Sequence, residues 1–134
     1  MEQFLGKKYK LTHSENFEEF MKALGVGFAT RKAGSLVSPV VELTKSGESY
    51  TFTSNSTFKK IEFTFKNGEE FDQETPDGRM VKSTIKVDGN TLHEIQKDAK
   101  GEQTVIDRIF SDDELKMELK FGNVSATRVY KIHA

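Results

Sequence analysis

The chain has 134 residues, a formal net charge of −1 and no cysteine. This length suits one domain, so we expect a single domain over residues 1–134. Acidic and basic residues are interspersed, which gives no reason to expect a nucleic-acid partner, and the lack of cysteine excludes disulfides and thiolate chemistry. The N-terminus has no apolar signal core, so we expect a soluble protein of the cytoplasm.

Two short helices are predicted near the N-terminus. Residues 16–24 carry apolar side chains at positions 17, 20, 21 and 24, which is the stripe of an amphipathic helix. Asn16 and Glu19 have the spacing of a capping box at its start. Residues 28–36 predict a second helix, and Pro39 then begins a strand.

Runs of alternating polarity, separated by turns rich in Gly, Asn and Asp, fill the rest of the chain. Residues 115–121, for example, are apolar at odd positions and charged at even ones, which is typical of a strand with one dry face. Short strands joined by regular turns predict a barrel or a sandwich. The ten predicted strands are residues 6–13, 39–45, 48–54, 58–66, 70–75, 79–87, 90–97, 102–110, 114–121 and 124–132.

Two of these strands place an arginine on a mainly apolar face. Arg128 alternates with Ala126 and Tyr130, and Arg108 alternates with Ile106 and Phe110. A buried cation costs several kcal/mol unless an anion or several acceptors meet it. No acidic residue shares the strand face of Arg128, so the two arginines predict a shared anion in the interior, and a bound anion is a functional hypothesis.

Segments along the whole chain resemble the intracellular lipid-binding proteins, and within them the fatty-acid-binding proteins of heart or muscle type, in an invertebrate-like form. The segments that carry the resemblance are residues 9–11 (YKL), 16–22 (NFEEFMK), 24–31 (LGVGFATR), 56–59 (STFK), 65–72 (FKNGEEFD) and 77–83 (DGRMVKS). The resemblance implies an all-β fold, a ten-stranded antiparallel up-and-down β-barrel, or β-clam. It also implies a helix-turn-helix lid between the first and second strands and a ligand chamber inside. The sequence departs from the vertebrate pattern around residues 92–103, so the residues that face the chamber there are left open.

The resemblance also implies an intracellular carrier of a long-chain fatty acid. In the family, two arginines and a tyrosine hold the ligand carboxylate, and these fall on Arg108, Arg128 and Tyr130. Contacts to the tail or the portal are expected from Phe17, Met21, Ala33, Pro39, Phe58, Asp77, Arg79 and Met117. Two interpretations stay open for several of them: Phe17 and Met21 also suit simple lid packing, and Arg79 also suits a surface ion pair beside a turn. No cofactor or metal ion is expected.

Three alternatives to a fatty-acid carrier remain. A retinoic-acid carrier of the same family needs the same carboxylate clamp. A lipid-metabolising enzyme needs a nucleophile or base in the chamber, and the scattered histidines 13, 93 and 133 lack zinc spacing, so we expect no catalysis. A β-sheet adaptor for protein partners predicts a filled core and an exposed apolar patch.

Basic residues lie on or beside the predicted lid and portal, namely Lys22, Arg31, Lys32 and Lys59. They suit transient docking on anionic lipid headgroups, and equally they suit ordinary solvated side chains. Lys22, Arg31 and Lys32 also raise the idea of a nuclear-targeting surface. We expect a monomer.

Overall fold

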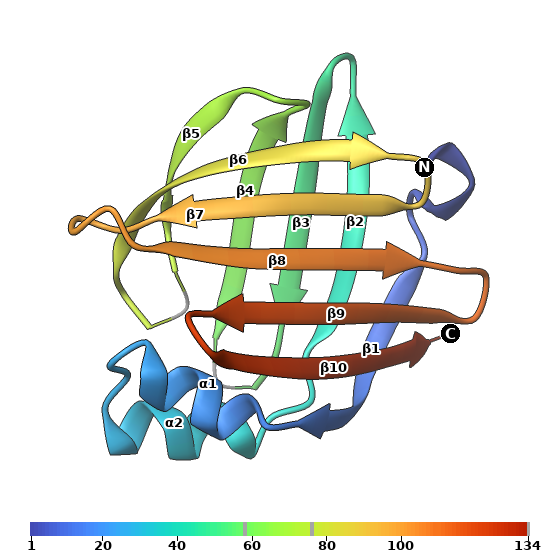
Figure 1. The fold of residues 1–134 in the computed structure, drawn as a ribbon. Helices are drawn as coiled ribbons and strands as arrows, with labels where there is room; N and C mark the ends of the chain where they lie inside the picture. Colours follow the sequence, from blue (N-terminus) through green and yellow to red (C-terminus); the bar gives the residue numbers. More distant parts are fainter. Residues whose placement is uncertain (58, 76, 134) are drawn as a thin grey trace.

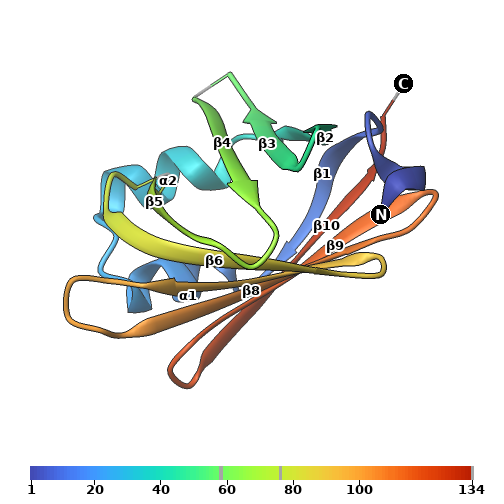
Figure 2. The same cartoon turned by 90° about the horizontal axis from the view of Figure 1, so that it is seen from above.

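The computed structural model describes residues 1–57, 59–75 and 77–133, and it is built on one antiparallel sheet of ten strands. The strands are β1 (Lys8–Glu15), β2 (Val40–Ser46), β3 (Ser49–Asn55), β4 (Lys60–Lys66), β5 (Glu70–Glu74), β6 (Met80–Asp88), β7 (Thr91–Lys97), β8 (Gln103–Phe110), β9 (Glu114–Phe121) and β10 (Val124–Ile132). Their order in the sheet is β4-β3-β2-β1-β10-β9-β8-β7-β6-β5, so the first and last strands pair and β4 and β5 form the two edges. The sheet curls into a nearly closed barrel (Figure 1 and Figure 2), which confirms the predicted fold.

Two helices, α1 (Phe17–Ala23) and α2 (Phe28–Ser35), connect β1 to β2 and lie across one end of the barrel (Figure 1). Phe20 and Met21 of α1 are buried, whereas α2 has no buried residue. Leu36, directly after α2, is 75% exposed. The predicted insertion of two helices is confirmed, and α1 is the helix that is anchored on the barrel.

The start of α1 differs from the prediction. Asn16 has a left-handed backbone with φ of 59°, and its side chain makes no capping hydrogen bond to the helix. Instead its Nδ2 donates to the carbonyl oxygen of Ser125 at 2.9 Å. The predicted capping box is therefore wrong. The Asn16 side chain instead makes a hydrogen bond to β10, and this bond fixes the start of the helix on the barrel wall.

Aromatic packing fills the end of the barrel away from the helices. The Tyr9 ring, at the start of β1, meets the Phe110 ring edge-on with centroids 5.8 Å apart, and Phe4 of the short 3-10 helix Glu2–Phe4 stacks on the same ring at 5.9 Å. The Tyr9 hydroxyl donates to the carbonyl oxygen of Ser111 at 3.0 Å. This end is therefore solid, and free interior space is left toward the helices.

The hairpin between β6 and β7 determines which side chains of β7 face inward. Asp88 pairs with Thr91, so the loop is only Gly89 and Asn90, and Gly89 has a φ of 61°, which favours glycine. This register places Glu94 directly opposite Ile85, a fully buried core residue. Opposite residues on paired strands share a face of the sheet, so Glu94 points into the barrel.

None of the helices in the described ranges has the length and apolar content needed to cross a membrane.

Candidate ligand-binding cavity

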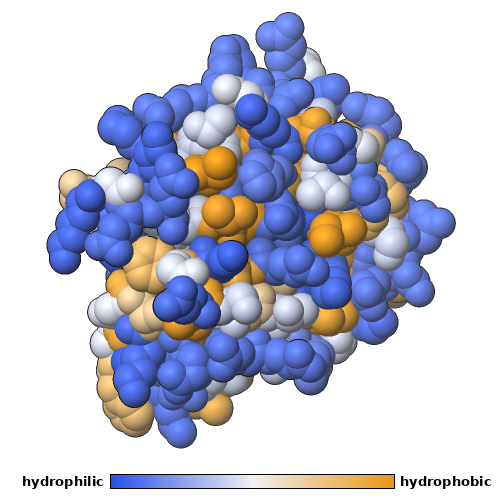
Figure 3. Space-filling view, in the orientation of Figure 1, coloured by the Kyte–Doolittle hydropathy of each residue, from blue (hydrophilic) through white to orange (hydrophobic). Residues whose placement is uncertain are grey.

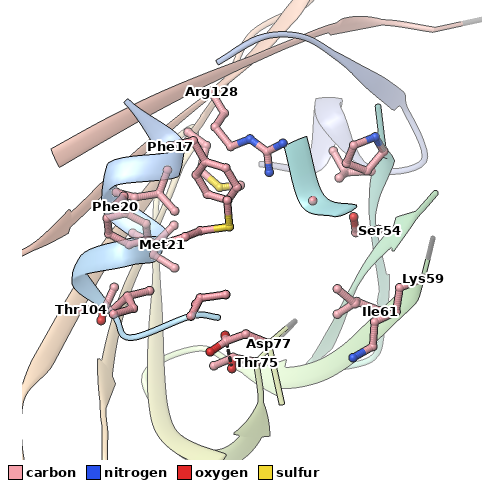
Figure 4. Close-up of a pocket in the computed structure, with 18 of the residues that line it drawn as sticks. Phe17, Phe20, Met21, Ser54, Lys59, Ile61, Thr75, Asp77, Thr104 and Arg128 are labelled. Carbon is pink, nitrogen blue, oxygen red and sulfur yellow. Dashed lines mark hydrogen bonds between the residues drawn. The ribbon is translucent and has the colours of Figure 1, made fainter. Parts of the chain in front are cut away.

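A cavity of about 210 Å³ lies inside the barrel beneath the helices. Its wall is mainly apolar, and the side chains come from both helices and from strands on both sides of the barrel (Figure 4). In the close-up, Phe17, Phe20 and Met21 of α1 face Ser54 and Ile61 on the opposite wall. A hollow enclosed by apolar side chains, with a few polar groups, is the usual form of a small-molecule site.

Most of the side chains predicted to contact a ligand line this cavity. They are Phe17, Met21, Pro39, Asp77, Arg79, Arg108, Met117, Arg128 and Tyr130. Ala33 is not among the lining residues in the described part of the chain, whereas Thr30 and Gly34 are. These two residues, four positions apart, share one face of α2, and Ala33 lies about 100° around the helix from Gly34. The prediction for Phe58 lies outside the described residues.

Strand register explains why the two arginines face the same interior. Met117 of β9 pairs with Arg108 on one side and with Arg128 on the other. The three side chains therefore share one face of the sheet. Two strand spacings separate the arginine Cα atoms, which corresponds to roughly 10 Å.

Arg128 is 8% exposed and has no acidic residue within ion-pair distance in the described ranges. Its Nε donates to the Ser14 hydroxyl at 3.2 Å, and its guanidinium carbon lies 4.0 Å from the centroid of the Phe17 ring. Figure 4 shows the guanidinium beside Phe17 at the edge of the cavity. Because a hydroxyl and aromatic faces, and no carboxylate of the described residues, meet this buried cation, it is prepared to receive an anion.

Tyr130 lies two residues from Arg128 on the same face of β10 and is 1% exposed. Burial raises the pKa of its phenol, and the charges of Arg128 and then Arg108 oppose that rise without cancelling it. The hydroxyl therefore stays protonated at neutral pH. A protonated hydroxyl beside a guanidinium is a second donor for a carboxylate.

Arg108 has a different environment, which the sequence interpretation missed. Its Nη1 donates to Oε1 of Glu94 at 2.6 Å, and the Glu94 side chain is fully buried. Gln96 Nε2 donates to the other Glu94 oxygen at 2.9 Å. The expectation that both arginines need one shared external anion is therefore wrong for Arg108, because an internal carboxylate already meets it.

Asp77 and Arg79 form an ion pair that also lines the cavity. Arg79 Nε lies 2.6 Å from Oδ2 of Asp77, and the Thr75 hydroxyl donates to Oδ1 at 2.7 Å. Burial raises the pKa of Asp77, but the hydrogen bonds from Arg79 and Thr75 outweigh it, so the pKa lies below its usual value. Arg79 therefore lines the cavity and also forms an ion pair, which is partly buried and not the surface pair of the alternative interpretation; its contact with a ligand stays a prediction.

Comparison with known proteins agrees with this geometry. The model of the lipocalin / cytosolic fatty-acid binding protein family matches residues 5–133. The chain belongs to this family. It is 49% identical to the muscle fatty-acid-binding protein of Schistocerca gregaria over 134 residues, which is 98% of each chain.

Two solved structures of family members superpose closely on the barrel. The fatty-acid-binding protein from brain tissue of Drosophila melanogaster has a TM-score of 0.90 and 55% identity, covering 96% of this chain and 98% of the other. The fatty-acid-binding protein of Schistosoma mansoni in complex with arachidonic acid has a TM-score of 0.94 and 44% identity, covering 100% and 98%. The predicted family membership is confirmed.

Over the described ranges, no three histidine, aspartate or glutamate side chains gather in a way that would hold a metal ion. The polar chemistry of the wall includes the Arg128 cation and the Tyr130 phenol, which lie together beside apolar side chains.

Proposed function

We propose that this protein is an intracellular carrier that holds one long-chain fatty acid in the cavity. The ligand carboxylate binds Arg128 and Tyr130, with Arg108 on the neighbouring wall, and the tail lies along the apolar side chains. The observation that carries the proposal is the buried Arg128 guanidinium, which lines an apolar cavity and meets no carboxylate among the described residues.

The two parts of a fatty acid contribute differently to binding. Burying a methylene group gains about 0.8 kcal/mol, so a tail of fourteen gains roughly 11 kcal/mol before the cost of ordering it. The planar guanidinium can form parallel charge-assisted hydrogen bonds with a carboxylate, and Tyr130 adds a third. Tail burial therefore sets the strength of binding, and the head group selects acids over neutral lipids of the same length.

Relatives support the ligand class. The Schistosoma mansoni protein, which is similar along the whole chain, is described in complex with arachidonic acid, and the Schistocerca gregaria relative is named for fatty-acid binding. We infer that the same class of ligand, an unbranched lipid acid, occupies this cavity. Carrying such a ligand through the cytoplasm requires only binding and release, so the proposal includes no catalysed step.

Displacement of a bound fluorescent fatty acid tests the ligand class. We expect oleate to displace the probe, retinoic acid to displace it less well, and oleyl alcohol to be the weakest of the three. Native mass spectrometry of the purified protein should show retained fatty acid. If retinoic acid binds decisively better than oleate, the ligand is a retinoid and not a fatty acid. Equal binding of oleate and oleyl alcohol would contradict the carboxylate site.

Release at membranes is the second part of the proposal. Phe28 and Leu36, at and directly after α2, are 67% and 75% exposed, and Lys22 of α1 and Lys32 of α2 are also exposed. Figure 3 shows apolar surface among hydrophilic side chains at the helical end of the molecule. Arg31 takes a smaller part, because its Nη1 donates to the carbonyl oxygen of Val26 at 2.6 Å.

We infer that this end docks transiently on anionic lipid headgroups, with Lys59 at the rim of the cavity. The rate of oleate transfer to vesicles should rise with their content of phosphatidylserine. A Lys22→Glu/Lys32→Glu variant should lose that rise and keep its affinity for oleate. Transfer at one rate for neutral and anionic vesicles would show that the ligand leaves by diffusion alone.

A further inference from the structure

One buried carboxylate near the proposed head-group site has no part in the function described so far. Glu94 of β7 is fully buried, and protein donors meet both of its oxygens: Arg108 Nη1 at 2.6 Å and Gln96 Nε2 at 2.9 Å. Arg108 lines the cavity, whereas Glu94 lies behind it. The guanidinium is thus held between an internal anion and the interior space.

Aromatic rings hold Arg108 in this orientation. Its guanidinium carbon lies 4.8 Å from the centroid of the Phe52 ring and 5.7 Å from that of Phe63. The charge of this cation is met by the Glu94 carboxylate and the ring faces, although its buried Nε has no hydrogen-bond partner in the described ranges. Arg128, by contrast, has a ring and a hydroxyl but no carboxylate beside it in the described ranges.

The charges around the arginines therefore do not balance. Two guanidinium groups and one carboxylate leave one positive charge, and it belongs to Arg128. One carboxylate of a ligand neutralises this end of the cavity, whereas a doubly charged head group leaves one negative charge unpaired away from water. Unpaired buried charge is strongly unfavourable, so this count discriminates between ligands.

We propose that Glu94 is a specificity-determining residue of the carrier. It acts as an internal carboxylate that occupies Arg108, confines the ligand head to Arg128 and Tyr130, and matches the cavity to singly charged lipids. The proposal rests on the fatty-acid function above and adds to it the number of charges that the ligand carries. Lipids with a phosphate monoester head, which carries close to two charges above pH 7, should bind more weakly than fatty acids on this basis.

Oleate, oleyl phosphate and oleyl alcohol share one tail and differ in head charge, so they test the proposal directly. Their dissociation constants would be measured by probe displacement at pH 7.5. The wild-type protein should prefer oleate to oleyl phosphate. Glu94→Gln, which keeps the shape of the side chain, should shift the ratio of the two constants at least tenfold toward the phosphate. Glu118→Gln, on the exposed face of β9, is the matched control and should leave the ratio unchanged.

Oleate binding in two Arg108 variants separates the role of Glu94 from a direct role of Arg108. This comparison still tests the proposal if the single variant Glu94→Gln fails to fold. Arg108→Gln leaves the Glu94 carboxylate unpaired near the ligand head and should weaken oleate binding at least tenfold. Adding Glu94→Gln to it removes the repulsion and should restore most of the lost affinity.

The possible results divide clearly. If oleate binding is equally weak in Arg108→Gln and in the double variant, or if Glu94→Gln leaves the head-group ratio unchanged, the proposal for Glu94 is overturned while the carrier function stands. If the wild-type protein does not distinguish oleate from oleyl alcohol, the carboxylate site itself fails.

Discussion

The guanidinium carbon of Arg128 lies 4.0 Å from the centroid of the Phe17 ring, which joins the proposed head-group site to the first residue of α1. The same helix start is fixed on β10 by the bond from Asn16 to the Ser125 carbonyl. The position of the lid and the environment of the cation are therefore set by neighbouring residues. An aromatic face over a cation excludes water from it and strengthens its attraction for an anion.

The first prediction concerns this ring. Phe17→Leu keeps an apolar side chain but removes the aromatic face, which contributes about 1–2 kcal/mol when the cation is desolvated. The dissociation constant for oleate should rise roughly five- to thirtyfold, measured by titration calorimetry. Phe28→Leu makes the same change on the exposed side of the lid and should have little effect. Similar losses in both variants would show that Phe17 serves only in lid packing.

The second prediction concerns the Tyr130 hydroxyl. Tyr130→Phe removes one hydrogen bond to the ligand carboxylate, and such bonds to charged groups contribute about 1.5–3 kcal/mol. Oleate should therefore bind at least tenfold more weakly, while oleyl alcohol should lose less. Tyr50→Phe is a suitable control, because the Tyr50 ring packs on Phe65 and does not line the cavity in the described ranges. If Tyr130→Phe binds oleate as tightly as the wild-type protein, the Tyr130 hydroxyl does not contact the ligand carboxylate.

Tyr130 also predicts a loss of stability in alkali. Burial raises its folded-state pKa above the usual 10.0 of a tyrosine, so the unfolded chain releases this proton first as the pH rises. The contribution to the free energy of unfolding is complete below pH 10 and is lost as the pH rises toward the folded-state pKa. Urea unfolding at pH 8 and pH 11 should show a smaller loss in Tyr130→Phe than in the wild-type protein, and equal losses would contradict the assignment.

Sequence patterns predicted the strands well, because polarity alternates strictly in those with one dry face. They left a barrel and a sandwich both open, and only the family resemblance implied the barrel. Residues 114–121 and 124–132 were predicted with the bounds that the structure shows, and their register brings Arg108 and Arg128 to the same interior. Where alternation is strict, the face of each side chain follows from position alone.

At Glu94 the alternation of polar and apolar residues does not predict which face of the strand is buried. In β7, polar and apolar residues occur on both faces, with Glu94 inside and Ile95 on the other side, so the local pattern does not decide which face is buried. The deciding signal is the two-residue loop after Asp88, which pairs Glu94 with Ile85. Asn16 gives a second case, because the spacing of a capping box carries no information about a bond to a strand more than a hundred residues away.

The fourth prediction concerns acid stability. Despite burial, hydrogen bonds from Arg79 and Thr75 hold the pKa of Asp77 below its usual 3.8, so this carboxylate stabilises the fold above that pH. The contribution is lost as the pH falls through the folded-state pKa. Asp77→Asn should lower the free energy of unfolding at pH 7 by about 1–3 kcal/mol and show a smaller further loss at pH 3.

Urea unfolding at the two pH values measures this effect. Asp72→Asn is the control, because Asp72 pairs with Lys82 on the surface at 2.9 Å and both side chains are largely exposed. Exposed pairs contribute little, so its effect should be below about 1 kcal/mol. An Asp72 variant as destabilised as the Asp77 variant would show that the partly buried position of Asp77 is unimportant.

The measurement that tests the central claim most directly compares oleate with oleyl alcohol on Arg128→Gln. Arg128 is the cation that lacks a carboxylate partner in the described ranges, so its loss should remove the distinction between acid and alcohol. We predict that the affinity for oleate falls at least tenfold while the affinity for oleyl alcohol changes less than twofold. Equal losses for the two ligands would contradict a carboxylate site at Arg128.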